Sequence, residues 1–135
     1  MTLKMKKTHL NEIFEEAKKK YPIEACGILA GKKHDSETVV EKVYHAKNIL
    51  NSTSAYRIDP ADQIKAFQEA EIEGREIIGF YHSHPFWEPY WSKEDEEKGK
   101  AWTNYFHIIV SLKNGRAKAY RKKREGVVEE ELNII

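Results

Sequence analysis

The sequence has little of what several classes of protein require. One cysteine in 135 residues excludes a disulfide framework within the chain and fits a reducing compartment, so we expect a cytoplasmic protein. No apolar run approaches the roughly 18 residues that span a bilayer, and no apolar segment follows the lysine-rich start. Basic residues (23) barely outnumber acidic ones (22), so the positive charge of a nucleic-acid binder is missing. We therefore expect neither a membrane nor a nucleic-acid partner.

The chain does have enough apolar material for one compact core. Hydrophobic residues make up 40% of the sequence and aromatic residues 11%, which excludes an acidic disordered chain. The length is that of one ordinary domain, which needs no metal or disulfide merely to fold. We expect residues 1–135 to form a single domain.

Hydrophobic periodicity and turn residues predict the order of the secondary structure elements. A helix over 10–21 ends at Pro22, and a second helix begins at Asp59-Pro60, an acidic cap followed by proline at the first helical position. A third, short helix begins at Ser92. Strands are expected at 25–30, 39–44, 56–58, 77–81, 105–112, 117–121 and near 127–128. This order predicts an α+β fold with a curved mixed β-sheet flanked by helices.

The stretch from His82 to Asp95 contains the residues that indicate chemistry. On an extended backbone residues i and i+2 point to the same side, so His82 and His84 converge on one point. Asp95 would complete a set of three protein ligands for Zn²⁺ that leaves the fourth position open for water, as in catalytic zinc sites. Each part also has a simpler interpretation: histidine pairs are often surface residues, and Ser92 with Asp95 matches a helix capping box. A capping box does not explain the two histidines.

The same residues resemble a known family. His82-Ser83-His84, seven residues, Ser92, two residues and Asp95 match the H-S/T-H-x7-S-x-x-D signature of the JAMM (MPN-plus) zinc metalloproteases. That family also has an upstream glutamate, and Glu24 stands in a block, residues 21–31, that is similar to the family's P-x-E-x-C-G pattern. Without this resemblance Glu24 would be interpreted as an ordinary acid after a helix. The likeness extends over about residues 8–121 and is strongest for the stand-alone prokaryotic type.

The resemblance implies a fold of the MPN/JAMM, cytidine-deaminase-like class and a role for each matching residue. His82, His84 and Asp95 would bind one Zn²⁺ per chain and a water that the metal activates. Glu24 would act as general base and acid, and Ser92 would hydrogen-bond the oxyanion. Cys26 is expected to be a small buried residue rather than a nucleophile.

One segment departs from the family pattern. Residues 86–91 (Phe-Trp-Glu-Pro-Tyr-Trp) are rich in large aromatics where the family has small residues, and the proline comes two places early. This loop, with Trp87 as a candidate substrate contact, fits a substrate clamp or a homodimer contact. Packing over the metal site explains it equally well.

The resemblance implies a zinc-dependent isopeptidase or peptidase that cleaves after the C-terminal tail of a ubiquitin-like or sulfur-carrier protein. The tail would lie beside the sheet as an added strand, with Tyr56, Arg57 and Ile58 as candidate contacts. Two alternatives stay open: a non-catalytic MPN scaffold, and a small-molecule zinc amidohydrolase. The retained ligand residues argue against the scaffold.

Overall fold

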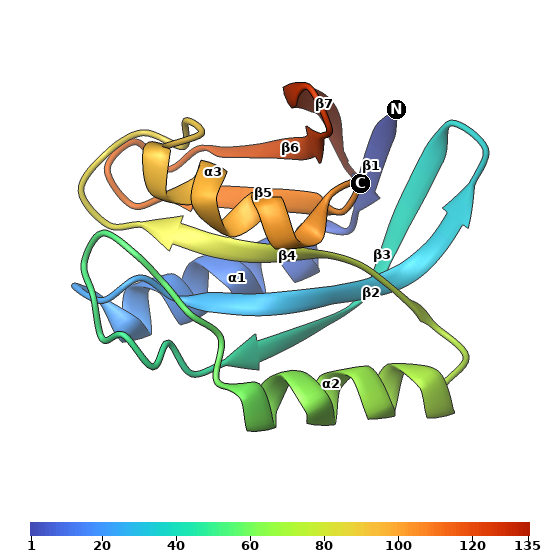
Figure 1. Cartoon of the computed structure of the whole chain (residues 1–135), viewed down its shortest axis with the longest axis horizontal. Helices are drawn as coiled ribbons and strands as arrows, with labels where there is room; N and C mark the ends of the chain where they lie inside the picture. Colours follow the sequence, from blue (N-terminus) through green and yellow to red (C-terminus); the bar gives the residue numbers. More distant parts are fainter.

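The computed structural model describes residues 1–135 and has the expected α+β composition (Figure 1). In chain order the elements are β1 (Thr2–Met5), α1 (Lys7–Lys20), β2 (Cys26–His34), β3 (Glu37–Ala46), α2 (Pro60–Ile72), β4 (Glu76–His84), α3 (Lys93–Gly99), a short 3₁₀ helix (Lys100–Trp102), β5 (Phe106–Ser111), β6 (Ala117–Lys123) and β7 (Gly126–Ile134). None of the helices combines the length and the apolar character that crossing a bilayer requires.

The strands form a mixed sheet that curls until it closes. Their order is β1-β3-β2-β4-β5-β6-β7, and β7 pairs with β1 again to give a closed barrel. The β4–β5 pair is parallel, and β1 is parallel to both of its neighbours; the other pairs are antiparallel. The curved mixed sheet is therefore confirmed, but its first strand was not expected from the sequence. Another expectation was wrong: the segment 56–58 is not a strand, and only Ile58 makes a single bridge, to Asn48.

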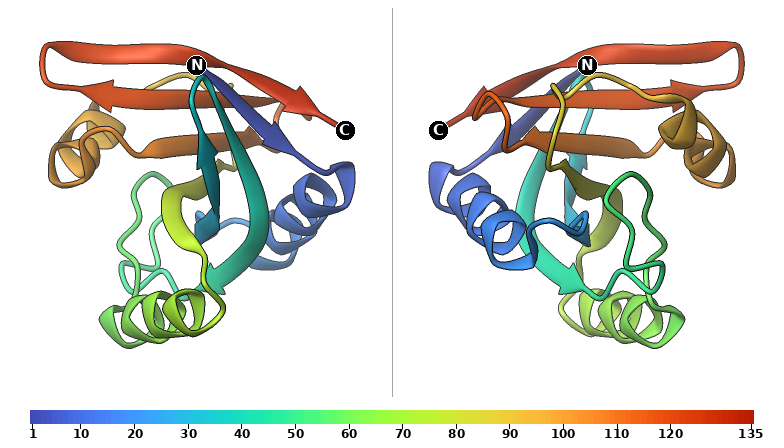
Figure 2. Two further views of the ribbon diagram at one scale, coloured as in Figure 1. Left: turned by 90° about the vertical axis from the view of Figure 1, so that its right-hand side faces the viewer. Right: turned by 90° about the vertical axis from the view of Figure 1, so that its left-hand side faces the viewer.

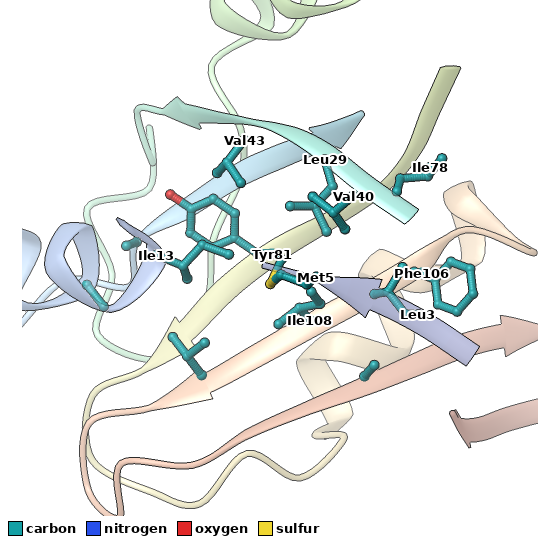
Figure 3. Close-up of a cluster of buried hydrophobic side chains, with 14 residues drawn as sticks. Leu3, Met5, Ile13, Leu29, Val40, Val43, Ile78, Tyr81, Phe106 and Ile108 are labelled. Carbon is teal, nitrogen blue, oxygen red and sulfur yellow. The ribbon is translucent and has the colours of Figure 1, made fainter. Parts of the chain in front are cut away.

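The two faces of the sheet carry different helices (Figure 2). The inner face packs against α1 and forms the main core, which includes Leu3, Ile13, Leu29, Tyr81 and Ile108 (Figure 3). The outer face of β2 and β4 packs against α2. There Ile28 and Phe80 contact Ala66, and the side chains of Tyr44, Ile58, Phe67, Ile77, Trp102 and Tyr105 surround them. Since side chains alternate along a strand, His82 and His84 face the same side of the sheet as Phe80.

Local features position β4 and the helix before it, α2. Asp59 caps α2 through its side chain, which accepts a hydrogen bond from the Ala61 N–H at 2.9 Å, and Pro60 occupies the first turn as expected. Gly79 lies where β4 and β5 approach closely, because a Cβ atom there would come within 2.2 Å of the Phe106 carbonyl oxygen. Parallel pairing from Gly79 onward then runs through His84, which ends β4.

Candidate metal centre and active site

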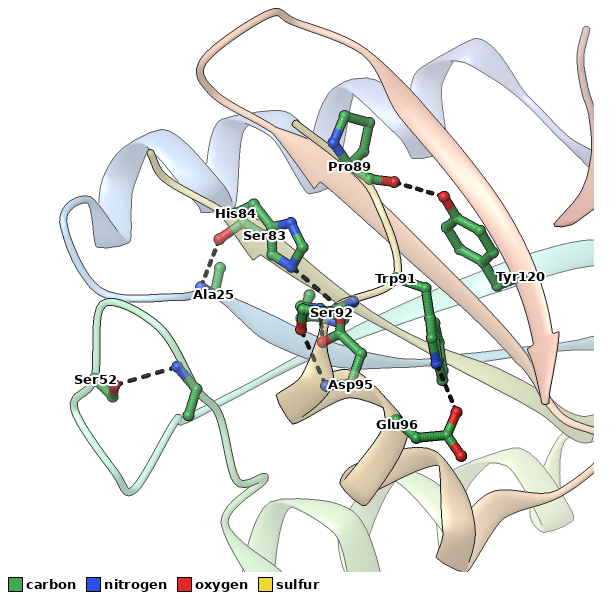
Figure 4. Close-up of polar contacts among 12 residues, drawn as sticks. Ala25, Ser52, Ser83, His84, Pro89, Trp91, Ser92, Asp95, Glu96 and Tyr120 are labelled. Atoms are coloured by element: carbon green, nitrogen blue, oxygen red, sulfur yellow. Dashed lines mark hydrogen bonds and ion pairs between the residues drawn. The ribbon is translucent and has the colours of Figure 1, made fainter. Parts of the chain in front are cut away.

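Two strand histidines and one helix carboxylate meet on the outer face of the sheet. His82 and His84 alternate along the end of β4. Asp95 lies in the first turn of α3, where it faces His84 (Figure 4). One potential ligand atom from each of the three lies within 4.8 Å of the other two. All three side chains are buried. The structure thus brings together the three residues that the sequence predicted as metal ligands.

The contacts within this cluster fit a metal better than they fit hydrogen bonding. The Nε2 atom of His82 lies 2.8 Å from Oδ1 of Asp95, and Nε2 of His84 lies 3.3 Å from Oδ2. Yet His82 Nε2 is buried and makes no hydrogen bond of acceptable geometry, because the ring is not aligned with the carboxylate. A buried polar atom without a partner is costly. Two imidazole nitrogens and a carboxylate turned to one point are a donor set that suits Zn²⁺.

The two imidazole rings are held in different ways. Nδ1 of His84 lies 2.8 Å from the carbonyl oxygen of Glu88, and donation to this carbonyl leaves Nε2 unprotonated and free to bind a metal. His82 has no such bond, since its Nδ1 atom is buried and without a partner. Its ring instead stacks on Tyr56, with centroids 4.6 Å apart and planes at 21°. We infer that Tyr56 fixes the orientation of His82.

Asp95 is positioned by the helix cap that the sequence predicted. The Ser92 N–H donates to Oδ2 of Asp95 at 2.8 Å, and the Asp95 N–H donates to Oγ of Ser92 at 3.1 Å. Burial by itself would raise the pKa of Asp95, but the attraction of His82 and the polar contacts of His82, His84 and the Ser92 N–H outweigh it. The pKa of Asp95 is therefore held well below its usual range, and the carboxylate is charged at neutral pH.

Glu24 is brought to the cluster by the pairing of β2 with β4. Cys26 faces His82 across this pair. One residue earlier, the Ala25 N–H donates to Oγ of Ser83 at 2.8 Å, and the Ser83 N–H donates to the Ala25 carbonyl at 3.0 Å. Ser83, between the two histidines, therefore fastens the segment that carries Glu24 to the strand that carries the ligands.

The carboxyl group of Glu24 is buried among other acids. Only 2% of the residue is exposed. Burial, and to a smaller extent repulsion by Asp95 and then by Glu94, together raise the pKa of Glu24 to about 9. A carboxyl group with a strongly raised pKa beside a cluster of ligand side chains is typical of a general acid–base residue.

Comparison with known proteins decides what this cluster belongs to. The family model described as "Prokaryotic homologs of the JAB domain" matches residues 6–123, which includes every residue of the site. This chain belongs to the JAB (JAMM/MPN) family. The resemblance in the motif is thereby confirmed over most of the chain.

Named relatives of the JAMM family are similar along most of their length. A desampylase from Pyrococcus furiosus is 37% identical over 108 residues, which are 80% of this chain and 73% of the relative. A CysO-cysteine peptidase from Mycobacterium tuberculosis is 27% identical over 129 residues, covering 93% of this chain and 86% of that protein. The solution structure of protein DSY2949 from Desulfitobacterium hafniense superposes with a TM-score of 0.86 at 29% identity, over 98% of this chain and 92% of that chain.

A groove leads away from the JAMM cluster on the side of His82. It has a volume of about 620 Å³ and lies between α2 and the α3–3₁₀ segment. Its lining includes the three candidate substrate contacts, Tyr56, Arg57 and Ile58, together with Ile64, Lys98 and Trp102. The fourth candidate, Trp87, lies elsewhere: its ring packs 5.7 Å from that of His84 and is half-buried.

Two further site residues can be placed. The Oγ atom of Ser92 accepts a hydrogen bond from Asp95, and its own hydroxyl proton has no acceptor within the chain, so it is free to donate. Cys26 is fully buried, and its thiol contacts the Ala46 carbonyl oxygen at 3.7 Å. Burial, followed by repulsion from Glu24, raises the pKa of the Cys26 thiol to about 12. The expected buried position of Cys26 is confirmed, and a neutral thiol is a poor nucleophile.

Sequence reasoning missed one residue that supports the site. Asn48 is buried, and all of its hydrogen-bonding capacity is used. Its Nδ2 donates to the carbonyls of Glu24 (3.0 Å) and Ala55 (3.1 Å), and its Oδ1 accepts from the N–H groups of Leu50 (3.1 Å) and Arg57 (3.0 Å). No sequence pattern indicates this role, because Asn48 stands in a polar, irregular stretch.

Proposed function

We propose that this chain is a zinc-dependent JAMM peptidase that cleaves after the C-terminal tail of a ubiquitin-like or sulfur-carrier protein. The observation that carries the proposal is a buried His82–His84–Asp95 cluster, in which both ring nitrogens of His82 lack a hydrogen-bond partner, together with a buried carboxyl group, Glu24, of strongly raised pKa. We take residues 1–135 to be one catalytic domain. The single free cysteine, Cys26, supports a reducing, cytoplasmic setting.

We assign one Zn²⁺ per chain to His82, His84 and Asp95. When bound, the zinc ion would act as a Lewis acid and lower the pKa of a coordinated water toward neutrality. The chain's own residues prepare the site for this ion. Glu88 fixes the tautomer of His84, Tyr56 orients the ring of His82, and the cap of α3 fixes Asp95.

We assign the proton transfers to Glu24 and the stabilisation of charge to Ser92. Beside a bound cation the raised pKa of the Glu24 carboxyl group would fall, and the Glu24 carboxylate would then accept a proton from the attacking water. The same carboxyl group then delivers this proton to the leaving nitrogen. The free hydroxyl of Ser92 donates to the scissile carbonyl oxygen, where negative charge develops.

The groove beside His82 suits the extended tail of a carrier protein. Arg57 pairs through its backbone with Asn48 and Ile49 on one side. The backbone N–H and C=O groups of Tyr56 and Ile58 make no hydrogen bond within the chain, and both residues line the groove. A segment whose outward backbone N–H and C=O groups are free can pair with an added strand. We therefore place the tail along Tyr56–Ile58, with the scissile bond next to His82.

The experiment that tests this function is a panel of ubiquitin-like and sulfur-carrier proteins, each conjugated through its C-terminal glycine, assayed with and without chelator. We expect cleavage of at least one conjugate, its loss with chelator, and recovery on addition of zinc. Glu24→Gln is expected to lower kcat by at least a thousandfold while zinc stoichiometry and folding stay intact, whereas the matched surface variant Glu12→Gln keeps full activity.

Other outcomes would point to other functions. Native protein without stoichiometric zinc would favour a non-catalytic scaffold. Zinc-dependent hydrolysis of small amides without cleavage of any carrier would favour an amidohydrolase. Normal turnover by folded Glu24→Gln would overturn the mechanism.

A further inference from the structure

Three aromatic side chains are exposed to solvent in this chain, and all three lie beside the metal cluster. They are Tyr21 (53% exposed), Phe86 (44%) and Tyr90 (49%), which we call the aromatic rim. The rings of Tyr21 and Phe86 meet edge to face, with centroids 5.5 Å apart. The twelve other aromatic residues of the chain are buried or half-buried. Large exposed aromatics gathered at one place mark an interaction surface.

The aromatic rim lies on the His84 side of the metal cluster, whereas the groove lies on the His82 side. The ring of Tyr90 lies 5.9 Å from that of His84, and Phe86 follows His84 closely in the loop that leaves β4. The groove, by contrast, reaches the cluster at His82, on which Tyr56 stacks. A substrate that crosses the cluster therefore has one part on Tyr56–Ile58 and the other part on the rim.

The loop that carries Phe86 and Tyr90 is held rigidly by its backbone. Three successive carbonyls each accept a hydrogen bond from a side chain of a different strand. The Trp87 carbonyl accepts from Ser111 Oγ (2.8 Å), and the Glu88 carbonyl contacts His84 Nδ1 (2.8 Å). The Pro89 carbonyl accepts from the Tyr120 hydroxyl (2.9 Å; Figure 4). The exposed rings are thus presented in a fixed arrangement. Binding to such a surface loses little conformational entropy.

We propose that the aromatic rim binds the acceptor side of the substrate: a polypeptide whose lysine side chain carries the conjugated carrier. This inference rests on the proposed function, in which the carrier tail occupies the groove and the leaving amine therefore projects over His84. The rim presents flat apolar rings, which suit the alkyl stem of a lysine and the apolar side chains around it. A free amino acid as leaving group would instead need a charged partner for its carboxylate, and the three rings supply none. The rim accordingly suits a polypeptide acceptor.

The test uses one carrier protein, cleaved by the wild type, in two forms. In the first form its C-terminal glycine is joined to a lysine of a second protein; in the second it is joined to aminomethylcoumarin. We compare kcat/KM for the two forms. Phe86→Ala, and Phe86→Ala combined with Tyr21→Ala, are expected to lower the ratio of the first value to the second about tenfold or more, through KM for the protein conjugate. Phe86→Tyr is expected to keep the ratio.

The control is Ile72→Ala, which removes the most exposed large apolar side chain, 85% accessible at the far end of α2. It should change neither value. An equal loss on both forms, or no loss on either, would overturn the proposal. So would light scattering that shows a wild-type dimer which Phe86→Ala converts to a monomer, because the rim would then be a contact between copies. If the wild-type enzyme cleaves neither form, the proposed function itself is refuted. If it cleaves both forms and the rim variants change nothing, only the proposed role of the rim is refuted.

Discussion

The side-chain amide of Asn48 donates a hydrogen bond to the main-chain carbonyl of Glu24, with Nδ2 and the carbonyl oxygen 3.0 Å apart. On its other side the Glu24 N–H donates to the Ser52 carbonyl at 2.9 Å. The backbone of the proposed base is therefore held by the loop between β3 and α2. This loop also supplies Tyr56 and the free edge of the groove, so one segment both holds the backbone of Glu24 and lines the groove.

Replacing Asn48 should damage catalysis as well as stability. Asn48→Asp keeps the shape but removes both donated hydrogen bonds and adds a buried charge. We expect kcat to fall at least tenfold, because Glu24 is misplaced, and the free energy of unfolding to fall by about 1–3 kcal/mol. Urea unfolding and steady-state kinetics measure the two effects. Asn11→Asp, on the exposed face of α1, is the matched control; equal behaviour of the two variants would refute this role.

Tyr56 should control metal affinity through the ring of His82. Removing a group that orients a metal ligand commonly weakens binding by 10- to 100-fold. We expect Tyr56→Ala to raise the zinc dissociation constant by about tenfold, and Tyr56→Phe, which keeps the stacked ring, to leave it unchanged. Competition with a chromogenic chelator measures the constant, and the visible spectrum of the cobalt-substituted protein reports ligand geometry. An unchanged constant in Tyr56→Ala would show that His82 needs no stacking partner.

The metal-free protein should lose stability as the pH rises. Burial and acidic neighbours raise the pKa of Glu24 from its ordinary value of 4.5 to about 9. Between these values the folded chain keeps a proton that the unfolded chain has released, so the stabilisation is complete below pH 4.5 and is lost toward pH 9. We expect a decrease on the order of several kcal/mol in chelator-treated protein. Glu24→Gln should flatten this slope, as should zinc in the wild type; a parallel slope in the variant would contradict the assignment.

At the acid end, His107 should act in the opposite direction. Burial lowers the pKa of this histidine to about 4. Below pH 6.5 the unfolded chain therefore binds a proton that the folded chain refuses until pH 4, and stability falls across this interval, by about 3 kcal/mol at most. His107→Phe has a ring of suitable shape between Phe80 and Trp91. The difference in urea midpoint between wild type and variant should change with pH between 6.5 and 4; a constant difference would exclude His107 as the cause.

The parts of the site that could be predicted from the sequence are those defined by short spacings. His82 and His84 share a face because any extended strand alternates, and Ser92 with Asp95 forms a capping box within one helical turn. Glu24 needed the family resemblance, since its approach to the histidines depends on the pairing of Cys26 with His82, 56 residues later in the chain.

The parts that could not be predicted depend on distant partners. β1 has only two inward apolar residues, Leu3 and Met5, and it is a strand because β3 and β7 flank it in parallel. The role of Asn48 depends on four backbone groups, the furthest of them 24 residues away. Tyr56 was expected in a strand and instead lies in an irregular loop, where its ring reaches His82.

The hydrogen bonds between Ser83 and Ala25 hold the proposed reaction centre together without using either of the surfaces proposed to bind substrate. The proposed ligands lie in β4 and in the cap of α3, and Glu24 lies just before β2. Two loops, residues 47–59 and 85–91, supply Tyr56–Ile58 to the groove and Phe86 and Tyr90 to the aromatic rim. Substitutions in these loops can therefore redirect the enzyme to another conjugate while the reaction centre stays as it is. A change of substrate specificity, by engineering or by divergence among relatives, therefore needs to alter only the surfaces on either side of an unchanged reaction centre.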